Sequence, residues 1–449
     1  MEKNELLPDG WVETNLENIC SINSGQSPPS STYNSIKDGL PFFQGNADFG
    51  ELYPNTRIWC SSPKKTAEKN DLLLSVRAPV GETNISKEKC CIGRGLAAIR
   101  PLNENMEIKF FIHFFRFVKN DLDSIGTGTT FKAISGKQIR DLKITLPPLN
   151  EQKRIIEKIE EVFSIIDNLK IALSKLSIQL KHFRQSILQY AFEGQLTKEW
   201  RIKNPNIHGN SRWNLNLEPI IDSSLPEIPN NWCWRKLEQI SNGVVVAFVG
   251  PTTKHYVDES KGVMFLRSQN VRKGKMNFNG LKYVEHSFHE KQKKSQIKPN
   301  NLLIVRVGAN RGDSCIVPNC ITIANAGNII IAKVFEDMSP LLNYFFQTDF
   351  CQKQLLGMTT GSAQGVINTT SVSHTLIPIV PIEEQNELIK KLEDGFSLVS
   401  NTENLITSMN SRLERLQSIT LKQAFEGKLV PQDPNDEPAS ELLKRIKNQ

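Results

Sequence analysis

The most regular pattern of apolar and polar positions in the chain is a heptad repeat between residues 155 and 187. Its apolar positions alternate four and three residues apart, a spacing that turns one stripe of a long helix towards a partner helix. The ten positions are Ile155, Ile159, Val162, Ile166, Leu169, Leu173, Leu176, Leu180, Phe183 and Ile187. Because the pattern continues for more than four heptads, it predicts a coiled coil. A helix of roughly 40 residues would be about 60 Å long.

The stretch that carries this pattern occurs twice, at an offset of 233 residues. Both copies open with Pro-x-x-Glu-Gln, from Pro148 and Pro381, and both close with Ala-Phe-Glu-Gly, from Ala191 and Ala424. Seven of the ten seam positions are apolar in the second copy. Those that we expect to pair include Leu392, Val399, Ile406, Met409 and Leu413. Two equal helices that face each other would hold two further domains at a fixed distance, although a repeated helical hairpin in a structural protein would give the same pattern.

The rest of the chain forms two bodies with a different pattern. Short apolar runs separated by Gly, Pro, Ser and Asn predict strands joined by turns in both bodies. The second body repeats the entry of the first, because Trp232 follows Pro229 as Trp11 follows Pro8. In the first body, the apolar and aromatic run at residues 110–118 predicts a buried helix.

The chain therefore alternates bodies and helices, which predicts an α+β protein with a pseudo-two-fold internal repeat. The predicted segments are a first body at 1–147, a first helix at 148–197, a linker at 198–228, a second body at 229–380, a second helix at 381–430 and a tail at 431–449 with a short helix from Ala439.

Length and composition fit this organisation. A chain of 449 residues is long enough for two or more cores, and 39% hydrophobic and 23% charged residues are typical of soluble globular proteins. We find no run of 18 apolar residues and no signal peptide, so we expect no membrane association. The eight cysteines form no CxxC pair, which favours reduced thiols in the cytoplasm.

The net charge of +7 is unevenly distributed. Residues 1–147 contain 18 basic and 17 acidic residues, whereas residues 229–380 contain 17 basic and 9 acidic residues. A surplus of eight positive charges in one body fits a surface that binds phosphate, although it would also serve solubility alone.

Motifs for catalysis and for metal binding are missing. The sequence Gly126-Thr127-Gly128-Thr129 lacks the third glycine of a dinucleotide fingerprint, so we interpret it as a loop. There is no phosphate-binding loop, no GxSxG, no amino-methyltransferase tetrapeptide such as NPPY and no PD…ExK nuclease set. His286 and His289 have no cysteine partners at zinc spacing, which favours a solvated basic loop over a metal site. We expect no catalytic residue and no metal site in this chain.

The predicted loops of both bodies carry the residue types that read DNA. Arginine suits guanine, and asparagine or glutamine suits adenine, because each offers two hydrogen bonds in one plane in the major groove. The same residue types are also common in turns and on surfaces. The candidate DNA contacts are Gln44, Asn46, Arg77, Thr129 and Lys132 in the first body, and Arg267, Gln269, Asn270, Arg272, Lys273, Arg306, Asn310, Arg311, Ser362 and Gln364 in the second.

The repeated helices resemble those of the specificity subunit of type I restriction–modification systems. The resemblance rests on the sequence at residues 146–152, on that at 191–197 and on their second copies, with Lys198-Glu199-Trp200-Arg201 and the entry at residues 7–11 adding to it. It spans the whole chain and is most specific in the helices. This sequence departs from the pattern at Val380, where the first copy has a second proline, and at three polar or glycine positions of the second seam.

The resemblance implies a DNA-recognition subunit without catalytic activity. Each body would be a target-recognition domain that reads one half of a bipartite, asymmetric site in double-stranded DNA. The helices would pair antiparallel, set the unread spacer and dock two modification subunits, which methylate adenine with S-adenosylmethionine. Restriction subunits, which need ATP and Mg, would join that core and act in phage defence. The chain itself would hold no cofactor.

Three alternatives to a complete restriction system stay open. A coiled-coil scaffold without nucleic acid would be excluded by salt-dependent DNA binding. A self-contained methyltransferase would transfer methyl groups as a purified single chain. A specificity subunit of a modification-only or phase-variable system would share every sequence feature described above.

Overall fold

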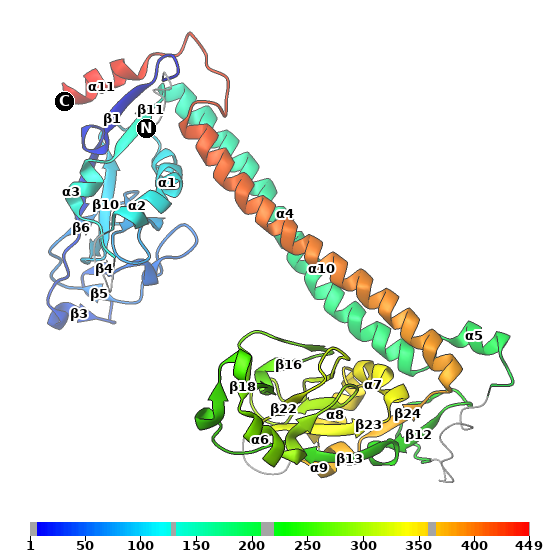
Figure 1. Ribbon diagram of the computed structural model, residues 1–449. Coiled ribbons are helices and arrows are strands. Elements are labelled where there is room, and N and C mark those ends of the chain that lie inside the picture. Colours follow the sequence, from blue (N-terminus) through cyan, green and yellow to red (C-terminus); the bar gives the residue numbers. More distant parts are fainter. Residues whose placement is uncertain (1–6, 127–131, 208–219, 358–364, 449) are drawn as a thin grey trace. The chain divides into compact units, whose positions relative to one another are not determined.

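The computed structural model describes residues 7–126, 132–207, 220–357 and 365–448. It divides into two compact units, and each unit contains one body and a part of both long helices (Figure 1). Unit 1 comprises Met1–Ser174 with Thr407–Gln449, and unit 2 comprises Lys175–Ile406.

Unit 1 contains a strand pair and two sheets. The strand pair is β1 (Val12–Asn15) with β11 (Lys143–Leu146). The four-stranded sheet has the spatial order β2 (Cys20–Ser24), β10 (Leu96–Pro101), β7 (Leu72–Ser75), β8 (Thr83–Ile85). The five-stranded sheet has the spatial order β3 (Tyr33–Asn34), β5 (Trp59–Cys60), β4 (Leu40–Phe43), β9 (Cys90–Ile92), β6 (Thr66–Ala67). The helices are α1 (Ile108–Phe117), α2 (Lys119–Ile125), α3 (Gly136–Arg140), α11 (Ala439–Lys447) and the short η1 (Leu16–Asn18), η2 (Ser30–Thr32) and η3 (Asn46–Asp48).

Unit 2 repeats the strand orders of unit 1. Its strand pair is β12 (Cys233–Lys236) with β24 (Leu376–Ile379). The four-stranded sheet has the spatial order β13 (Ser241–Val246), β23 (Ile329–Val334), β20 (Leu302–Val305), β21 (Ser314–Ile316). The five-stranded sheet has the spatial order β14 (Tyr256–Val257), β18 (Lys282–Val284), β15 (Val263–Leu266), β22 (Ala324–Ala326), β19 (Gln296–Ile297). A hairpin of β16 (Val271–Arg272) and β17 (Lys275–Met276) is added.

Apart from its parts of the two long helices, the helices of unit 2 are short. They are α5 (Lys198–Lys203), α6 (His286–Lys291), α7 (Ser339–Phe345), α8 (Asp349–Gly357), α9 (Thr369–Ser373), η4 (Leu237–Ile240), η5 (Thr253–His255), η6 (Glu259–Lys261), η7 (Ser268–Asn270), η8 (Lys293–Ser295) and η9 (Glu336–Met338). In both units the third strand of the five-stranded sheet runs parallel to the strand after it, β4 to β9 and β15 to β22, and antiparallel to the strand before it. The two bodies therefore share one topology, which their sequences indicated only loosely.

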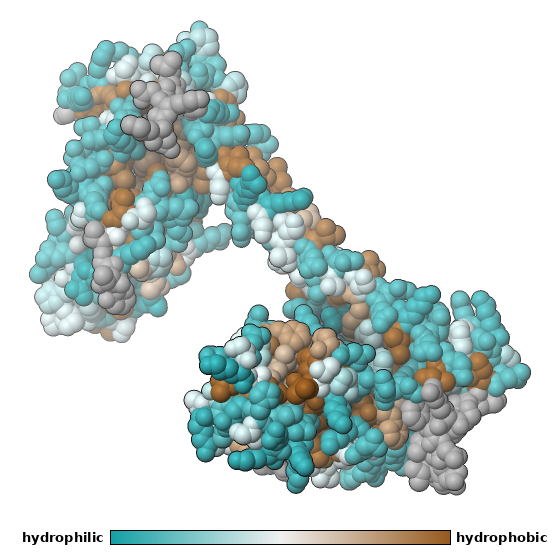
Figure 2. All heavy atoms as spheres, in the orientation of Figure 1, coloured by the Kyte–Doolittle hydropathy of each residue, from teal (hydrophilic) through white to brown (hydrophobic). Residues whose placement is uncertain are grey.

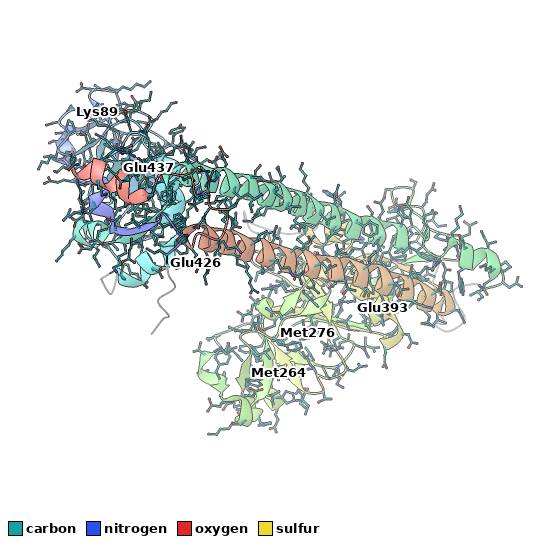
Figure 3. All side chains as sticks on the ribbon, turned by 90° about the horizontal axis from the view of Figure 1, so that it is seen from above. Lys89, Met264, Met276, Glu393, Glu426 and Glu437 are labelled. Atoms are coloured by element: carbon teal, nitrogen blue, oxygen red, sulfur yellow. The ribbon has the colours of Figure 1, made fainter. Side chains whose placement is uncertain are left out.

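The two long helices, α4 (Leu149–Phe192) and α10 (Ile382–Phe425), have 44 residues each. In unit 1 the first part of α4 runs beside the last part of α10, and Lys170 donates to Gln417 over 3.0 Å. In unit 2 the last part of α4 runs beside the first part of α10, where Ile187 lies against Gly395. The helices therefore pair antiparallel, as Figures 1 and 3 show.

The buried seam between these helices is narrower than the sequence pattern. Ile159, Ile166 and Leu173 on α4 and Leu392, Val399, Ile406 and Leu413 on α10 are buried at seven-residue intervals, and Ile155 is buried at the start of α4. Val162 and Leu180 are half-buried. Leu169, Leu176 and Met409, which were also expected to pair, are 43%, 36% and 45% exposed and are therefore only partly covered. Two helices bury chiefly the central stripe that each turns towards the other, so positions at the side of that stripe stay partly exposed.

Both long helices end just before a glycine that packs against the entry of a body, the second body for Gly194 and the first body for Gly427. Gly194 and Gly427 have φ of 73° and 67°, a left-handed conformation that stops a helix and favours glycine. A Cβ at Gly194 would lie 2.2 Å from Pro229, and a Cβ at Gly427 would lie 2.3 Å from Pro8. Each helix end thus packs on the entry of a body, so a side chain at either glycine would be both strained and obstructed.

The cores lie between the sheets and the short helices that cover them. The helix predicted at residues 110–118 is α1, in which Phe110 and Phe114 are buried against Phe425 at the end of α10. The predicted tail helix is α11, which buries Ala439 and Leu442 in the same core. Among the described residues, no helix is both long and apolar enough to cross a membrane.

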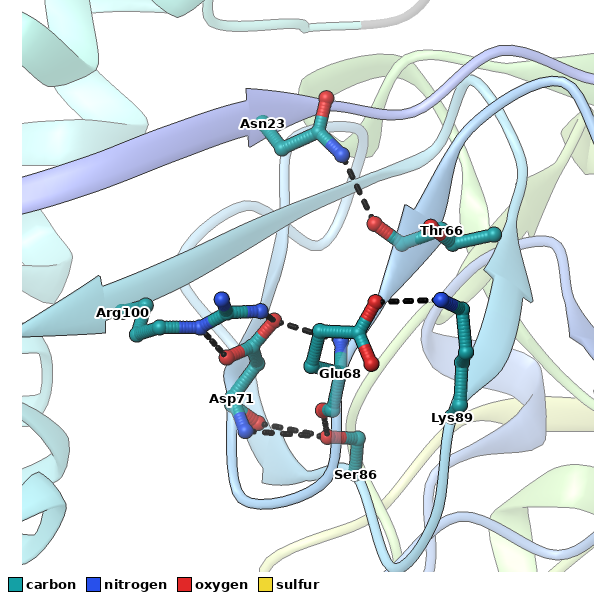
Figure 4. Close-up of polar contacts among 7 residues, drawn as sticks. All are labelled: Asn23, Thr66, Glu68, Asp71, Ser86, Lys89 and Arg100. Atoms are coloured by element: carbon teal, nitrogen blue, oxygen red, sulfur yellow. Dashed lines mark hydrogen bonds and ion pairs between the residues drawn. The ribbon is translucent and has the colours of Figure 1, made fainter.

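A polar cluster fixes the start of β7 in unit 1 (Figure 4). The buried carboxylate of Asp71 accepts two hydrogen bonds from Arg100 on β10, of 2.6 and 2.9 Å. It also accepts from the backbone of Glu68 over 2.8 Å, while the backbone of Asp71 donates to Ser86 over 3.0 Å. A two-pronged arginine–carboxylate contact of this kind fixes direction as well as distance, so it holds the strand from which Arg77 emerges.

Candidate nucleic-acid interface

The segment between β15 and β16 in unit 2 carries three of the predicted contacts, Arg267, Gln269 and Asn270, and one of them is structural. Asn270 is fully buried, accepts from the backbone of Arg267 over 3.0 Å and donates to the carbonyl of Asn277 over 2.8 Å. The oxygen and the nitrogen of its amide are both hydrogen-bonded within the loop, and the residue is not exposed. The prediction that Asn270 contacts DNA is therefore wrong. Its role is to shape the segment that presents Arg267 and Gln269.

Arg267, Gln269 and Asn310 lie around one hollow of about 430 Å³. They come from two separate loops, one after β15 and one after β20, and Phe248 and Phe265 also line the hollow. Arg267 donates to the carbonyl of Gly280 over 2.8 Å, and its Nε is buried with no partner among the described residues. Gln269 and Asn310 are exposed. The fold thus gathers one guanidinium and two amides that sequence alone placed on separate turns.

The other basic residues of unit 2 that were predicted to contact DNA differ in how many hydrogen bonds they already make within the protein. Arg272 donates to the carbonyls of Ser268 and Val271 over 2.9 and 2.7 Å, so it braces its own loop. Arg311 donates to the carbonyl of Gly365. Arg306 is half-buried, and its Nε has no hydrogen-bond partner among the described residues. Lys273, in the β16–β17 turn, is exposed and fits a phosphate contact better than Arg272 does.

Unit 1 places Gln44 and Asn46 at the corresponding point, directly after β4. The backbone N–H of Gln44 donates to Asp48 over 2.8 Å, as that of Arg267 donates to Asn270 in unit 2. Gln44 is exposed and Asn46 is half-buried.

The remaining predicted contacts lie apart from this group. Arg77 is exposed beyond β7, where its backbone bridges to Ala133. Lys132 is paired with Asp123 at 2.7 Å, and because both side chains are about half exposed the pair contributes little to stability. Thr129, Ser362 and Gln364 lie outside the described residues.

The two histidines at helical spacing are His286 and His289. They lie on the short helix α6 rather than in the predicted loop, and Nδ1 of His289 is hydrogen-bonded to the buried Asn325. Within the described ranges, no group of three histidine, cysteine, aspartate or glutamate side chains could hold a metal ion.

A second group of surface residues, which sequence reasoning missed, lies on the helix pair of each unit. Its members are apolar, more than a third exposed and adjacent to the buried seam: Ile165, Leu169, Leu176 and Phe183 on α4, and Leu398, Leu405, Met409 and Leu416 on α10. We call this set the apolar stripe, and Figure 2 shows hydrophobic side chains along the helices. Exposed apolar residues that gather on one side of a helix pair are typical of a protein-binding surface. The signal in the sequence was a run of apolar positions wider than one partner helix can cover.

Comparisons with known proteins place the chain among specificity subunits. The family model of the type I restriction modification DNA specificity domain matches residues 8–177 and 257–410. The putative type I restriction enzyme MjaX specificity subunit of Methanocaldococcus jannaschii is 38% identical over 192 residues, which are 42% of this chain and 44% of that protein. The type I restriction enzyme EcoBI specificity subunit of Escherichia coli is 24% identical over 460 residues, or 98% of this chain and 92% of that one.

Solved structures share the fold. A chain from a study of complex assembly and conformational transition of the type I R-M system has a TM-score of 0.72 at 18% identity, and the match covers 94% of this chain and 100% of that one. The HsdS subunit from Thermoanaerobacter tengcongensis has a TM-score of 0.56 at 17% identity, with 95% and 99% covered.

Proposed function

The chain belongs to the type I restriction–modification DNA specificity family, whose members are the non-catalytic DNA-recognition components of these systems, and on that premise we propose how its parts divide the work. Residues 1–147 and 229–380 are two target-recognition domains that each read one half of a bipartite, asymmetric site in double-stranded DNA. Residues 148–197 and 381–430 are the spacer helices, residues 198–228 the linker and residues 431–449 the tail.

One observation carries this proposal above all others. The two bodies share their strand orders, yet directly after the equivalent strands β4 and β15 one presents Gln44 and Asn46 and the other presents Arg267 and Gln269. A common scaffold with different hydrogen-bonding side chains at one place is what two readers of different sequences require. Two such readers on one face of a duplex are naturally separated by about one helical turn, roughly 34 Å.

The apolar stripe supports a second role, the docking of two modification subunits. The stripe occurs on both helices and flanks the seam on each, so the internal repeat supplies two equivalent surfaces. The modification subunits would supply S-adenosylmethionine and methylate adenine. Restriction subunits with ATP and Mg would join the same assembly. The specificity subunit would thereby direct methylation or restriction to the site that its bodies read.

Replacing Arg267 with alanine tests the reading role. Arg267 reaches the edge of the hollow from the loop after β15, so its loss should relax one base position of the half-site read by residues 229–380. The expected penalty is about 1–3 kcal/mol at that position, and the other half-site should not change. The measurement is binding of the complex with modification subunits to duplexes substituted one base pair at a time.

Lys291→Ala is the matched control for Arg267→Ala. Lys291 is exposed on α6, so its loss can weaken DNA binding evenly across sequences but should not change the preferred bases. If Arg267→Ala left every base preference intact, or changed both half-sites alike, Arg267 would not be a base contact of this body.

Replacing Leu169 and Met409 with glutamate tests the docking role. Both residues are in the apolar stripe, and a carboxylate there would have to be desolvated when a partner covers it. Co-purification with the modification subunits should fall at least tenfold, a loss of about 1.4 kcal/mol or more. Ile171→Glu is the control, because Ile171 is 54% exposed on the side of α4 away from the seam. Equal losses in both variants would contradict docking along the stripe.

A further inference from the structure

We propose that Phe278 reads a thymine in the half-site bound by residues 229–380, through contact with the 5-methyl group of that base in the major groove. The inference rests on the proposed function, because it assumes that this body binds DNA with the loops around Arg267. It assigns a specificity role to a residue that lies outside the hydrogen-bonding set predicted above. Four structural features support it.

The turn that carries Phe278 is fastened to the predicted reading loop. The backbone N–H of Asn277 donates to the carbonyl of Asn270 over 2.8 Å, and the Asn270 amide donates back to the carbonyl of Asn277 over 2.8 Å. The Asn277 side chain donates to the carbonyl of Gln269 over 3.2 Å. Beyond the tip, Arg267 and Gln269 both donate to the carbonyl of Gly280, over 2.8 and 3.2 Å.

This bracing holds Phe278 in place before any ligand arrives. Hydrogen bonds close the turn on both sides of the residue, so little backbone freedom remains to be lost on binding. Arg267 and Gln269, which fasten the turn, are themselves predicted base contacts. Phe278 is therefore presented at a fixed position next to the groups that would read neighbouring bases.

The Phe278 ring is exposed although it is large and apolar. Its exposed fraction is 48%, and none of the hydrophobic clusters formed by the described residues includes it. A single exposed apolar residue is ordinary on a protein surface. The position is what distinguishes Phe278: it stands between Asn277 and Asn279, in a turn that is hydrogen-bonded to the half-buried Arg267 and the exposed Gln269.

Unit 1 builds the same turn with a different residue at the tip. The backbone N–H of Asn55 donates to the carbonyl of Asp48 over 2.8 Å, as that of Asn277 donates to Asn270. Arg57 then fastens the far side of the turn, with bonds of 3.0 Å to the carbonyl of Ala47 and 2.5 Å to Asp48. Between them stands the exposed Thr56. One scaffold thus carries a small hydroxyl side chain in one body and an aromatic ring in the other.

Thymine is the base that an exposed apolar ring in the major groove would select. It alone among the four bases presents a methyl group there, whereas cytosine presents an amino group at the neighbouring position. Contact between the ring and the methyl group removes both from water. A buried methyl group contributes about 0.8 kcal/mol, or roughly a fourfold change in affinity. The amino group of cytosine would be left against the ring without a hydrogen-bond acceptor.

The test uses the complete complex with its modification subunits and a duplex that contains the recognised site. Each thymine in the half-site of residues 229–380 is replaced in turn by deoxyuridine, which removes only the methyl group. One replacement should weaken binding by wild-type protein about fourfold. The same replacement should leave binding by Phe278→Ala unchanged, because the contact is already absent. Phe278→Leu should retain most of the preference, since leucine is also apolar.

Thr56→Ala is the matched control, because it alters the equivalent tip in the other body and should leave this half-site unaffected. The inference is overturned if no thymine in the half-site responds to deoxyuridine, if the half-site contains no thymine, or if Phe278→Ala and wild type respond equally. In each of these cases the wild-type complex still binds a gapped site. Failure of the wild-type complex to select any gapped site would instead refute the proposed function.

Discussion

The carboxylate of Glu384 links the start of α10 to the second body through three hydrogen bonds, and its removal should show what this link contributes to stability. Glu384 lies in the first turn of α10 and is fully buried. It accepts hydrogen bonds from Thr197 over 2.7 Å, from Arg201 over 2.5 Å and from Asn231 over 2.9 Å. These partners lie just beyond the end of α4, on α5 and at the entry of the second body. One acidic side chain thus joins three segments.

Glu384→Ala should destabilise unit 2 by about 3 kcal/mol. Removing one partner of a buried ion pair costs roughly 3–5 kcal/mol, because the remaining charge has lost its counterion. The lower end applies here, since the Arg201 side chain is 19% exposed and keeps its 2.5 Å bond to the carbonyl of Gly194. Glu384→Gln keeps the shape but not the charge, and should cost about 1–2 kcal/mol.

Glu151→Gln is the control that the internal repeat supplies. Glu151 occupies the equivalent position on α4 and is equally buried, but it accepts only from Trp11, over 3.0 Å, and its other oxygen has no partner among the described residues. Burial raises the pKa of this carboxyl group, while the Trp11 hydrogen bond and the nearby charge of Arg154 act to lower it, and no arginine among the described residues donates to it. A neutral amide should therefore cost about 1 kcal/mol or less.

The assay is urea unfolding, combined with hydrogen exchange to assign the loss to a unit. For Glu384→Ala we expect faster exchange at residues 194–203 and 229–236, with unit 1 unchanged. Equal free energies of unfolding for Glu384→Ala and Glu151→Gln would refute the reasoning, because the ion pair with Arg201 would then contribute nothing.

Two further predictions concern the helices and the core against which they pack. Inserting or deleting one helical turn between Ile166 and Leu180 should change the length of the unread spacer in the recognised site and leave both half-sites intact. Altered half-sites in the methylation pattern would contradict the proposal that the helices set the spacer length. Burial lowers the pKa of His113 from 6.5 to about 3, so the unfolded chain binds a proton that the folded chain does not, and stability should fall as pH drops from about 6.5 towards 3. His113→Phe should remove about 2 kcal/mol of the loss between pH 7 and pH 5, and unfolding curves of equal pH dependence would contradict this.

The heptad pattern and its second copy predicted two helices of equal length that pair, because the spacing of apolar residues along one helix can be read directly from the sequence. It did not predict which seam residues stay exposed. Leu173 and Leu176 are both leucines of the same repeat, but Leu173 is buried in the three-dimensional structure and Leu176 is 36% exposed. The glycine stops were also predictable, since Gly194 and Gly427 follow the last apolar position of each repeat.

The candidate DNA contacts were harder to predict from the sequence. Asn270 has the right chemistry for adenine, but its partners at Asn277 and Asn279 lie across a turn whose closure the sequence does not reveal. The closure of this turn also leaves the ring of Phe278 exposed to solvent. The sequence alone does not indicate this exposure, because an aromatic residue between two asparagines could equally be buried. Glu151 and Glu384 occupy the same position in the two copies and still differ, because Arg201 comes from the segment after α4.

Mapping N6-methyladenine across the genome of a host with and without this gene tests the central claim most directly. The account predicts that one bipartite motif with a fixed, unread gap loses its methylation when the gene is absent. Its two halves should differ in sequence, as the two bodies differ in the side chains after β4 and β15. An unchanged methylation map, with the modification subunits expressed and active, would contradict the account.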